Sequence, residues 1–169
     1  MPRHALWRAS GRRAAAPADP TPEAPVALRP GSALRFQHGY PGTGNLGAGW
    51  WGTDAYGAWS RGREAVLVLP LEAPHDGSLT LTVELTPFLA HTRPHLEVGV
   101  AIDGAPAARW GFSGTGGVAE HRRVTVPARA GRERIAVRFA IRHPLSPPAA
   151  RYGSDPRPLG FALLGVAVD

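Results

Sequence analysis

The chain has 169 residues, which suits one domain with a sizeable hydrophobic core. Its 21 glycines and 18 prolines exclude a fold of long helices, and the lack of cysteine excludes disulfides, thiolate metal sites and a cysteine nucleophile. The net charge of +6 comes from arginines spread over the whole chain, and no nucleic-acid-binding motif accompanies them, so we expect no specific nucleic-acid partner.

The N-terminal segment is rich in Arg, Ala and Pro and has no continuous apolar run of the kind a secretory signal needs. We predict a disordered or loosely attached arm over residues 1–27 and a single domain over residues 28–169. No later segment has 18 uninterrupted apolar residues, so we expect no membrane insertion and take a cytoplasmic location as the working assumption.

The segment GNLGAGWWGTDAYGAWSRG, from Gly44 to Gly62, carries three of the five tryptophans. It is predicted to be a long loop, and loops of this length in a compact domain are usually functional or disordered. Successive side chains in an extended segment point in opposite directions. We therefore predict that Trp50 and Trp59 are largely buried and close one end of the core, and that Trp51 and Tyr56 are more exposed.

Most of the remaining chain alternates apolar and polar residues with period two, which is typical of strands that are buried on one face. Residues 63–71 and 159–168 are more continuously apolar, as in central or doubly covered strands. Asp76-Gly77 and Asp103-Gly104 are strong hairpin signals. The side chains that this pattern most clearly places in the core are Leu81, Val83, Val98, Val100, Val137, Phe139 and Ile141.

About eight such strands with almost no helical periodicity predict an all-β fold, an antiparallel two-sheet β-sandwich. A jelly-roll topology is the first expectation, and an immunoglobulin-like arrangement is the second.

Two stretches of the chain also carry a resemblance. The stretches LGAGW…DAYGAWSRG and SPPAARYGSDPRPLG, with VGVAIDGAPAARW between them, resemble a β-sandwich accessory domain found at the C-terminal ends of bacterial glycosyltransferases and other surface-polysaccharide synthesis proteins. The likeness covers roughly Leu34 to Val168. Asp54 and Tyr56 stand where that domain usually has Glu and Trp, and Trp51 is extra. The resemblance implies a sandwich fold and a polysaccharide context without catalytic activity.

The predicted ligand-binding residues lie in the two stretches that carry this resemblance. An exposed aromatic ring can stack on a sugar, while carboxylate, amide and guanidinium groups can hydrogen-bond its hydroxyls. The alternative is structural: Arg157 pairs with Asp54 or Asp155 and ties two loops together. The five predicted residues are Asn45, Trp51, Asp54, Tyr56 and Arg157.

Catalytic and metal-binding motifs do not stand out in the sequence. The seven histidines are scattered, Pro94 prevents His91 and His95 from aligning on a helix, and no P-loop or nucleophile motif occurs. We therefore predict no metal, no cofactor and no enzymatic activity. Arg134, Arg138 and Arg142 share one strand face, which would extend into a basic surface if a neighbouring strand added His121 and Arg123.

The leading functional hypothesis is a non-catalytic accessory module of bacterial polysaccharide synthesis that binds a glycan or a glycosyltransferase partner. The second hypothesis is a structural scaffold that binds another protein. A jelly-roll hydrolase or lyase is the least favoured. The oligomeric state and the identity of any ligand cannot be read from the chain.

Overall fold

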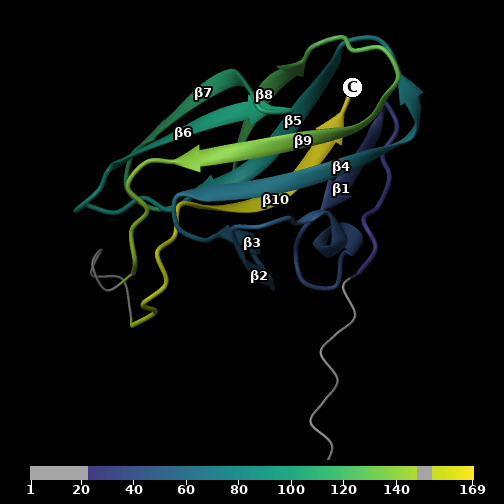
Figure 1. Cartoon of the computed structure of the whole chain (residues 1–169). Helices are drawn as coiled ribbons and strands as arrows, with labels where there is room; N and C mark the ends of the chain where they lie inside the picture. Colours follow the sequence, from purple (N-terminus) through teal and green to yellow (C-terminus); the bar gives the residue numbers. More distant parts are fainter. Residues whose placement is uncertain (1–22, 148–153) are drawn as a thin grey trace, which may run out of the picture.

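The computed structural model describes residues 23–147 and 154–169 of the chain (Figure 1). Two antiparallel sheets face each other, and the helical structure in the described residues is one short 3₁₀ turn, η1 (Pro41–Asn45). The first sheet has the order β2 (Trp50–Asp54), β3 (Gly57–Ser60), β10 (Phe161–Val168), β5 (Leu79–Pro87) and β8 (Glu120–Val126), with β1 (Ser32–Arg35) also paired to β10. The second has the order β4 (Glu64–His75), β9 (Arg132–Ile141), β6 (His95–Ile102) and β7 (Ala105–Ser113).

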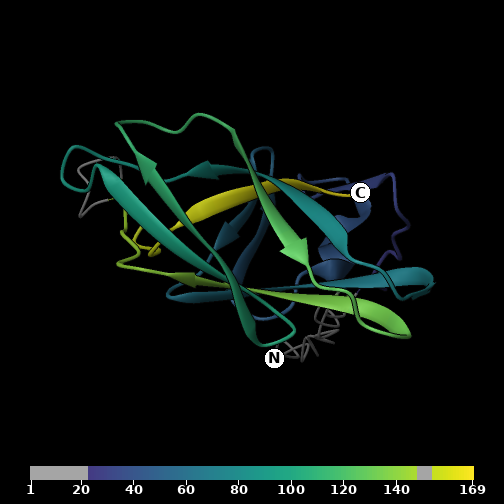
Figure 2. The ribbon, with the colours of Figure 1, turned by 90° about the horizontal axis from the view of Figure 1, so that it is seen from above.

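The predicted jelly roll is confirmed by this strand order. The series β3-β10-β5-β8 faces the series β4-β9-β6-β7, and the chain changes sheet at most connections, as two interlocked Greek keys require. Viewed from above, yellow β10 of one sheet and green β9 of the other lie in separate layers (Figure 2). The strands β1 and β2 are additions to this eight-strand plan in the described part of the chain.

The space between the sheets is filled by the side chains that the period-two pattern selects. Each of the seven predicted core residues is at most 3% exposed, so that prediction is confirmed. Burial of a large aliphatic or aromatic side chain stabilises the fold by about 1.5–3 kcal/mol. Phe139 and Phe161 meet at the centre of the core, with ring centroids 5.3 Å apart.

The two Asp-Gly turns have different roles. Asp103 and Gly104 both have positive φ, 48° and 85°, and join the paired strands β6 and β7 as a two-residue hairpin. Asp76-Gly77 instead joins β4 of one sheet to β5 of the other, so the hairpin prediction is wrong there. The Asp76 carboxylate accepts a 2.7 Å hydrogen bond from the Gly131 amide, which fixes this corner against the β8–β9 connection.

The segment from Gly44 to Gly62 is not a long loop, because most of it forms the β2–β3 hairpin. Glycine is required where this segment meets its neighbours. Gly49 has φ of 89°, and a Cβ there would lie 2.0 Å from the Glu64 carbonyl oxygen. Gly57 has φ of 134°, and a Cβ there would lie 2.3 Å from the Leu163 carbonyl oxygen. These close approaches seat the hairpin against β4 and β10.

The two strongly apolar strands also differ in position. β10 is central, as predicted, because β5 lies along one edge and β3 and β1 share the other. β4 is the terminal strand in its sheet order, so of the two predicted alternatives the central position is wrong, while its outward residues Val66 and Val68 are half-buried rather than exposed. Its outer edge is joined by the segment before β2, where Leu46 forms a bridge with Leu67 and the Gly47 amide donates to the Val66 carbonyl.

Candidate functional site: the outer face of the β2–β3 hairpin

Trp50 closes one side of the core. Its register partner is Ser60, which is fully buried, and its indole Nε1 donates a 2.7 Å hydrogen bond to the Val66 carbonyl. The ring meets Phe139 and Phe161 edge-on, with centroid distances of 6.2 and 5.9 Å. Trp50 therefore seals the core as predicted, although its side chain is half-buried rather than largely buried.

Trp51, the next residue, points the opposite way and is half-buried on the outside of the hairpin. Its indole Nε1 donates to the Pro158 carbonyl at 3.4 Å, which ties β2 to the segment that leads into β10. The guanidinium carbon of Arg61 lies 4.5 Å from the centre of the Trp51 ring system, and that of Arg157 lies 5.7 Å from it. Both distances are within the range of cation–π attraction.

Arg157 is held in place by Asp155 rather than by Asp54. The Arg157 Nε lies 2.9 and 2.8 Å from the two Asp155 carboxylate oxygens, and the Arg157 backbone amide donates to the same carboxylate. These hydrogen bonds from Arg157 lower the pKa of Asp155, and the reciprocal bond raises the pKa of Arg157. The segment before β10 is thus linked to β2 by the contact of Arg157 with Trp51, not by an ion pair of Arg157 with Asp54.

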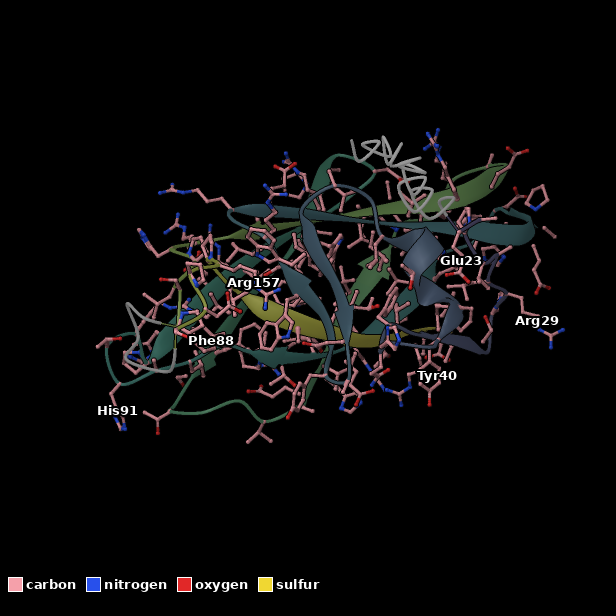
Figure 3. The ribbon with its side chains drawn as sticks, turned by 90° about the horizontal axis from the view of Figure 1, so that it is seen from below. Glu23, Arg29, Tyr40, Phe88, His91 and Arg157 are labelled. Carbon is pink, nitrogen blue, oxygen red and sulfur yellow. The ribbon has the colours of Figure 1, made fainter. Side chains whose placement is uncertain are left out.

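We call the group formed by Trp51, Arg61, Asp155, Arg157 and the Pro158 carbonyl the Trp51 surface. Among the described residues, Arg61 has no ion-pair partner, and its side chain is exposed. The surface therefore combines an aromatic ring with one free cation and one neutralised cation. Arg157 lies beside the hairpin when the molecule is viewed from below, and Tyr40 lies on the other side of the hairpin (Figure 3).

Asp54 organises the turn between β2 and β3. One carboxylate oxygen accepts hydrogen bonds from the backbone amides of Tyr56 and Gly57, at 2.8 and 3.2 Å, as in an Asx turn. The other oxygen accepts a 3.1 Å hydrogen bond from the Trp59 indole. Tyr56, at the tip of this turn, is 72% exposed, in agreement with the prediction.

Trp59 does not close the core, so that prediction is wrong. Its strand neighbours Ala58 and Ser60 are fully buried, and alternation along β3 places Trp59 on the outer face of the sheet. There it is half-buried and packs edge-on against Phe88, with a centroid distance of 6.4 Å. Trp59 and Phe88 thus support the outer face of the hairpin from beside the Asp54 turn.

Asn45 is buried and does not belong to the site, so its prediction as a ligand contact is wrong. Its side chain is 0% exposed, and its amide oxygen accepts from the Val26 backbone nitrogen at 2.9 Å. Its amide nitrogen donates to the carbonyls of Val26 and Val68, both at 2.9 Å. Asn45 holds the segment before β1 against β4, and no polar group is left for a sugar hydroxyl.

The hairpin brings together Trp51 and Arg157, and it places Asp54 and Tyr56 at its tip. Sequence reasoning missed Arg61 and Phe88. A signal for Arg61 was present, because it follows Trp59 by two residues and so shares its strand face. Phe88 carried no such signal, because its contact with Trp59 depends on how β5 packs beside β10.

The predicted basic surface does not extend beyond β9. His121 and Arg123 lie on β8, which belongs to the other sheet. On β9 itself, Arg138 pairs with Glu64 at 3.3 Å, and Arg142, the residue after β9, lies 3.4 Å from a Glu97 oxygen. The arginine face of β9 is therefore an ordinary solvated face with surface ion pairs.

Residues 23–147 and 154–169 hold no group of three or more His, Asp or Glu side chains arranged to bind a metal ion. No helix in these ranges has the length and hydropathy that a membrane span requires.

No protein-family model and no curated protein matches the chain. Among solved structures, latent dimeric PorU of Porphyromonas gingivalis is similar with a TM-score of 0.49 and 13% identity, over 89% of this chain and 13% of that chain. A CBM36 carbohydrate-binding module in complex with calcium and xylotriose has a TM-score of 0.40 and 11% identity, over 82% of this chain and 88% of that chain.

A CBM36-1 domain of a multidomain xylanase from the hindgut metagenome of Trinervitermes trinervoides is similar to the same degree. Its TM-score is 0.41 at 10% identity, over 80% of this chain and 95% of that chain. With TM-scores below 0.5 and identities of 10–13%, these likenesses give no information about the function or the binding residues of this chain.

Proposed function

We propose that the protein is a non-catalytic glycan-binding module and that the Trp51 surface is its contact face. The observation that carries the proposal is the orientation of Trp51. Its ring lies outside the core, with two guanidinium groups within the range of cation–π attraction, while its neighbour Trp50 performs the structural role. A half-buried indole with polar groups at its rim matches the chemistry of a sugar, which has apolar C–H faces and a ring of hydroxyls.

Two polar groups on the surface have capacity for a sugar hydroxyl. The Arg61 guanidinium has free donors, and the Asp155 carboxylate accepts from three N–H groups of Arg157, fewer than its four acceptor positions. A sugar that stacks on the ring face now covered by Arg61 displaces an exposed cation–π contact, worth about 0.5–1 kcal/mol. Because Arg61 has no carboxylate partner among the described residues, it can move aside and then bond to the bound sugar.

The state of the two carboxylates supports a binding role rather than hydrolysis. Asp54 is committed to the backbone of its turn and to Trp59, and Asp155 is committed to Arg157. A glycosidase needs two carboxyl groups that face each other across the scissile bond, one of them with a raised pKa. The pKa of Asp155 is instead lowered, by its hydrogen bonds from Arg157.

The proposal includes a biological context that follows from the sequence resemblance. The module would serve bacterial polysaccharide synthesis in the cytoplasm and act beside a glycosyltransferase. A single open aromatic surface binds weakly, so a repeating polymer or a partner enzyme would raise the effective concentration. A protein partner that recognises the same surface is the alternative occupant.

The test compares two exposed aromatic residues. We expect Trp51→Ala to abolish retention on a glycan array or in affinity electrophoresis, while the melting temperature changes little. Tyr40→Ala is the matched control, because Tyr40 is 52% exposed and lies on the other side of the hairpin from Arg157, outside the Trp51 surface (Figure 3). If Trp51→Ala binds every glycan that the parent protein binds, or if the parent protein binds none, the proposal is wrong.

A further inference from the structure

A second concave site lies at the end of the four-stranded sheet, outside the Trp51 surface. It is a cleft of about 570 Å³ where β6 begins and where β7 and β9 end. Gly111 on β7 has nothing within 4 Å of the position where a Cβ would stand, which leaves space over the strand. The polar side chains that line the cleft are those of Arg93, His95, Glu97, Ser113, Arg142 and His143.

Arg93 is the unusual member of this group. Its Nη2 donates a 2.5 Å hydrogen bond to the Phe88 carbonyl, but Nε and Nη1 are buried without any hydrogen-bond partner. Burial lowers the pKa of Arg93, since the charged form loses hydration. A buried guanidinium with two unused donors is costly for a fold, and an anion in the cleft would supply the missing acceptors.

The charges around Arg93 leave the cleft positive. Glu97 is the acidic side chain that lines it, and one oxygen of Glu97 lies between Arg142 Nε at 3.4 Å and Arg109 Nε at 3.5 Å. One carboxylate is thus shared by two arginines, and Arg93 remains uncompensated.

We infer that the Arg93 cleft binds the carboxylate group of an acidic sugar residue, of the uronic acid class. The inference that the carboxylate belongs to a sugar rests on the proposed glycan-binding function. A carboxylate has two acceptor oxygens in one plane, which matches the end-on fork that Nη1 and the second N–H of Nη2 of Arg93 would offer once the side chain turns toward the cleft. Arg142 supplies a second cation among the side chains that line the cleft.

The cleft and the Trp51 surface lie at the same end of the sandwich. The Phe88 carbonyl holds Arg93, while the Phe88 ring packs on Trp59 of the hairpin. A backbone bridge between Leu145 and Leu159 joins the segment after His143 to the segment that carries Arg157. Phe88, His91 and Arg157 lie toward one end in Figure 3, with Arg29 at the other. One acidic polymer can therefore meet both sites.

The experiment titrates the full chain with oligogalacturonate, oligoglucuronate and oligomannuronate, and with the neutral methyl ester of each, at physiological ionic strength. We expect the acid form of at least one to bind about tenfold more tightly than its ester, which corresponds to about 1.4 kcal/mol. Arg142→Gln and Arg93→Gln should each remove most of that difference. Arg29→Gln removes the same charge at the other end of the molecule and should leave it unchanged, which excludes general attraction to a basic protein.

The outcomes separate the two proposals. Equal affinity for acid and ester, or an unchanged difference in Arg142→Gln, overturns the cleft proposal. Because Arg142 is exposed, that variant should fold even if Arg93→Gln does not. Loss of both acid and ester binding in Trp51→Ala supports the glycan-binding surface whatever the cleft does. If the cleft variants lose acid binding and Trp51→Ala loses nothing, the cleft proposal stands and the Trp51 surface is wrong.

Discussion

The interior between the sheets and the Trp51 surface are built from different side chains in different ways. The interior consists of aliphatic residues and phenyl rings that repeat at every second position of long strands. The Trp51 surface consists of an indole, two guanidinium groups and a carboxylate, contributed by β2, the end of β3 and the segment before β10. The core depends on many interchangeable contacts, whereas the surface depends on a few directional ones.

Trp50 and Trp51 show this difference within two adjacent residues. Trp50 meets Phe139 and Phe161 in the core, and Trp51 meets Arg61 and Arg157 outside it. Strand alternation separates them. Because Trp50 makes the packing contacts with the core, side chains of the Trp51 surface can be substituted without loss of that packing.

The largest effect is expected from a charge placed in the interior. Val137 is fully buried on β9, and Val137→Asp puts a carboxylate there without a partner. Total stability of a domain is about 5–15 kcal/mol, so this variant should be unfolded at room temperature by circular dichroism. Ala140→Asp on the same strand is the control, because Ala140 faces solvent and should leave the melting curve nearly unchanged. A native-like melting curve for Val137→Asp would show that the interior tolerates a carboxylate as well as the exposed face of β9 does.

The next effect separates the two adjacent tryptophans. Trp50→Ala removes two edge-on aromatic contacts and a hydrogen bond to Val66, and should cost about 3 kcal/mol in denaturant unfolding. Trp51→Ala removes exposed cation–π contacts and a long hydrogen bond, and should cost about 1 kcal/mol or less. Equal losses of unfolding free energy in the two variants would mean that the Trp51 surface contributes as much to stability as the core contacts of Trp50 do.

The smallest effect concerns the charge pair on the surface. Hydrogen bonds from Arg157 lower the pKa of Asp155 below that of a free aspartate, so the ion pair stabilises the folded state above the unfolded pKa. That contribution is lost as the pH falls through the lowered, folded pKa. We expect a change in Trp51 fluorescence with a midpoint below about pH 4, because Arg157 lies near that ring. Asp155→Asn should abolish the transition, and a transition that persists in this variant would assign it to another group.

The interior could be predicted from sequence because period two is a local property. Alternation along residues 78–88, 95–103 and 134–142 identifies the buried face before any partner strand is known. The same rule separates Trp50 from Trp51. Strand pairing is less accessible, and Asp76-Gly77 shows why: a turn signal specifies a change of direction, not which sheet receives the next strand.

The site could be predicted only in part, because tertiary contacts decide the role of each polar residue. Asn45 looked available to a ligand, yet its amide is fully buried and hydrogen-bonded to three backbone groups. Trp59 was assigned to the core, but β3 pairs with β10 in a register that turns it outward. Arg93 gave no signal at all, since its unused donors depend on the fold around the β5–β6 connection.

The position of β10 has a consequence for how the protein folds. This strand comes after all its neighbours in the chain, yet it lies between β5 on one edge and β3 and β1 on the other. During synthesis on the ribosome, β1, β3 and β5 leave the exit tunnel before β10. Their apolar faces therefore stay exposed to solvent until β10 has been made. Pairing across most of the chain length is entropically costly and slow, in the millisecond-to-second range for all-β domains. The Pro158 carbonyl that meets Trp51 arrives with β10, so ligand binding would report the last step of folding.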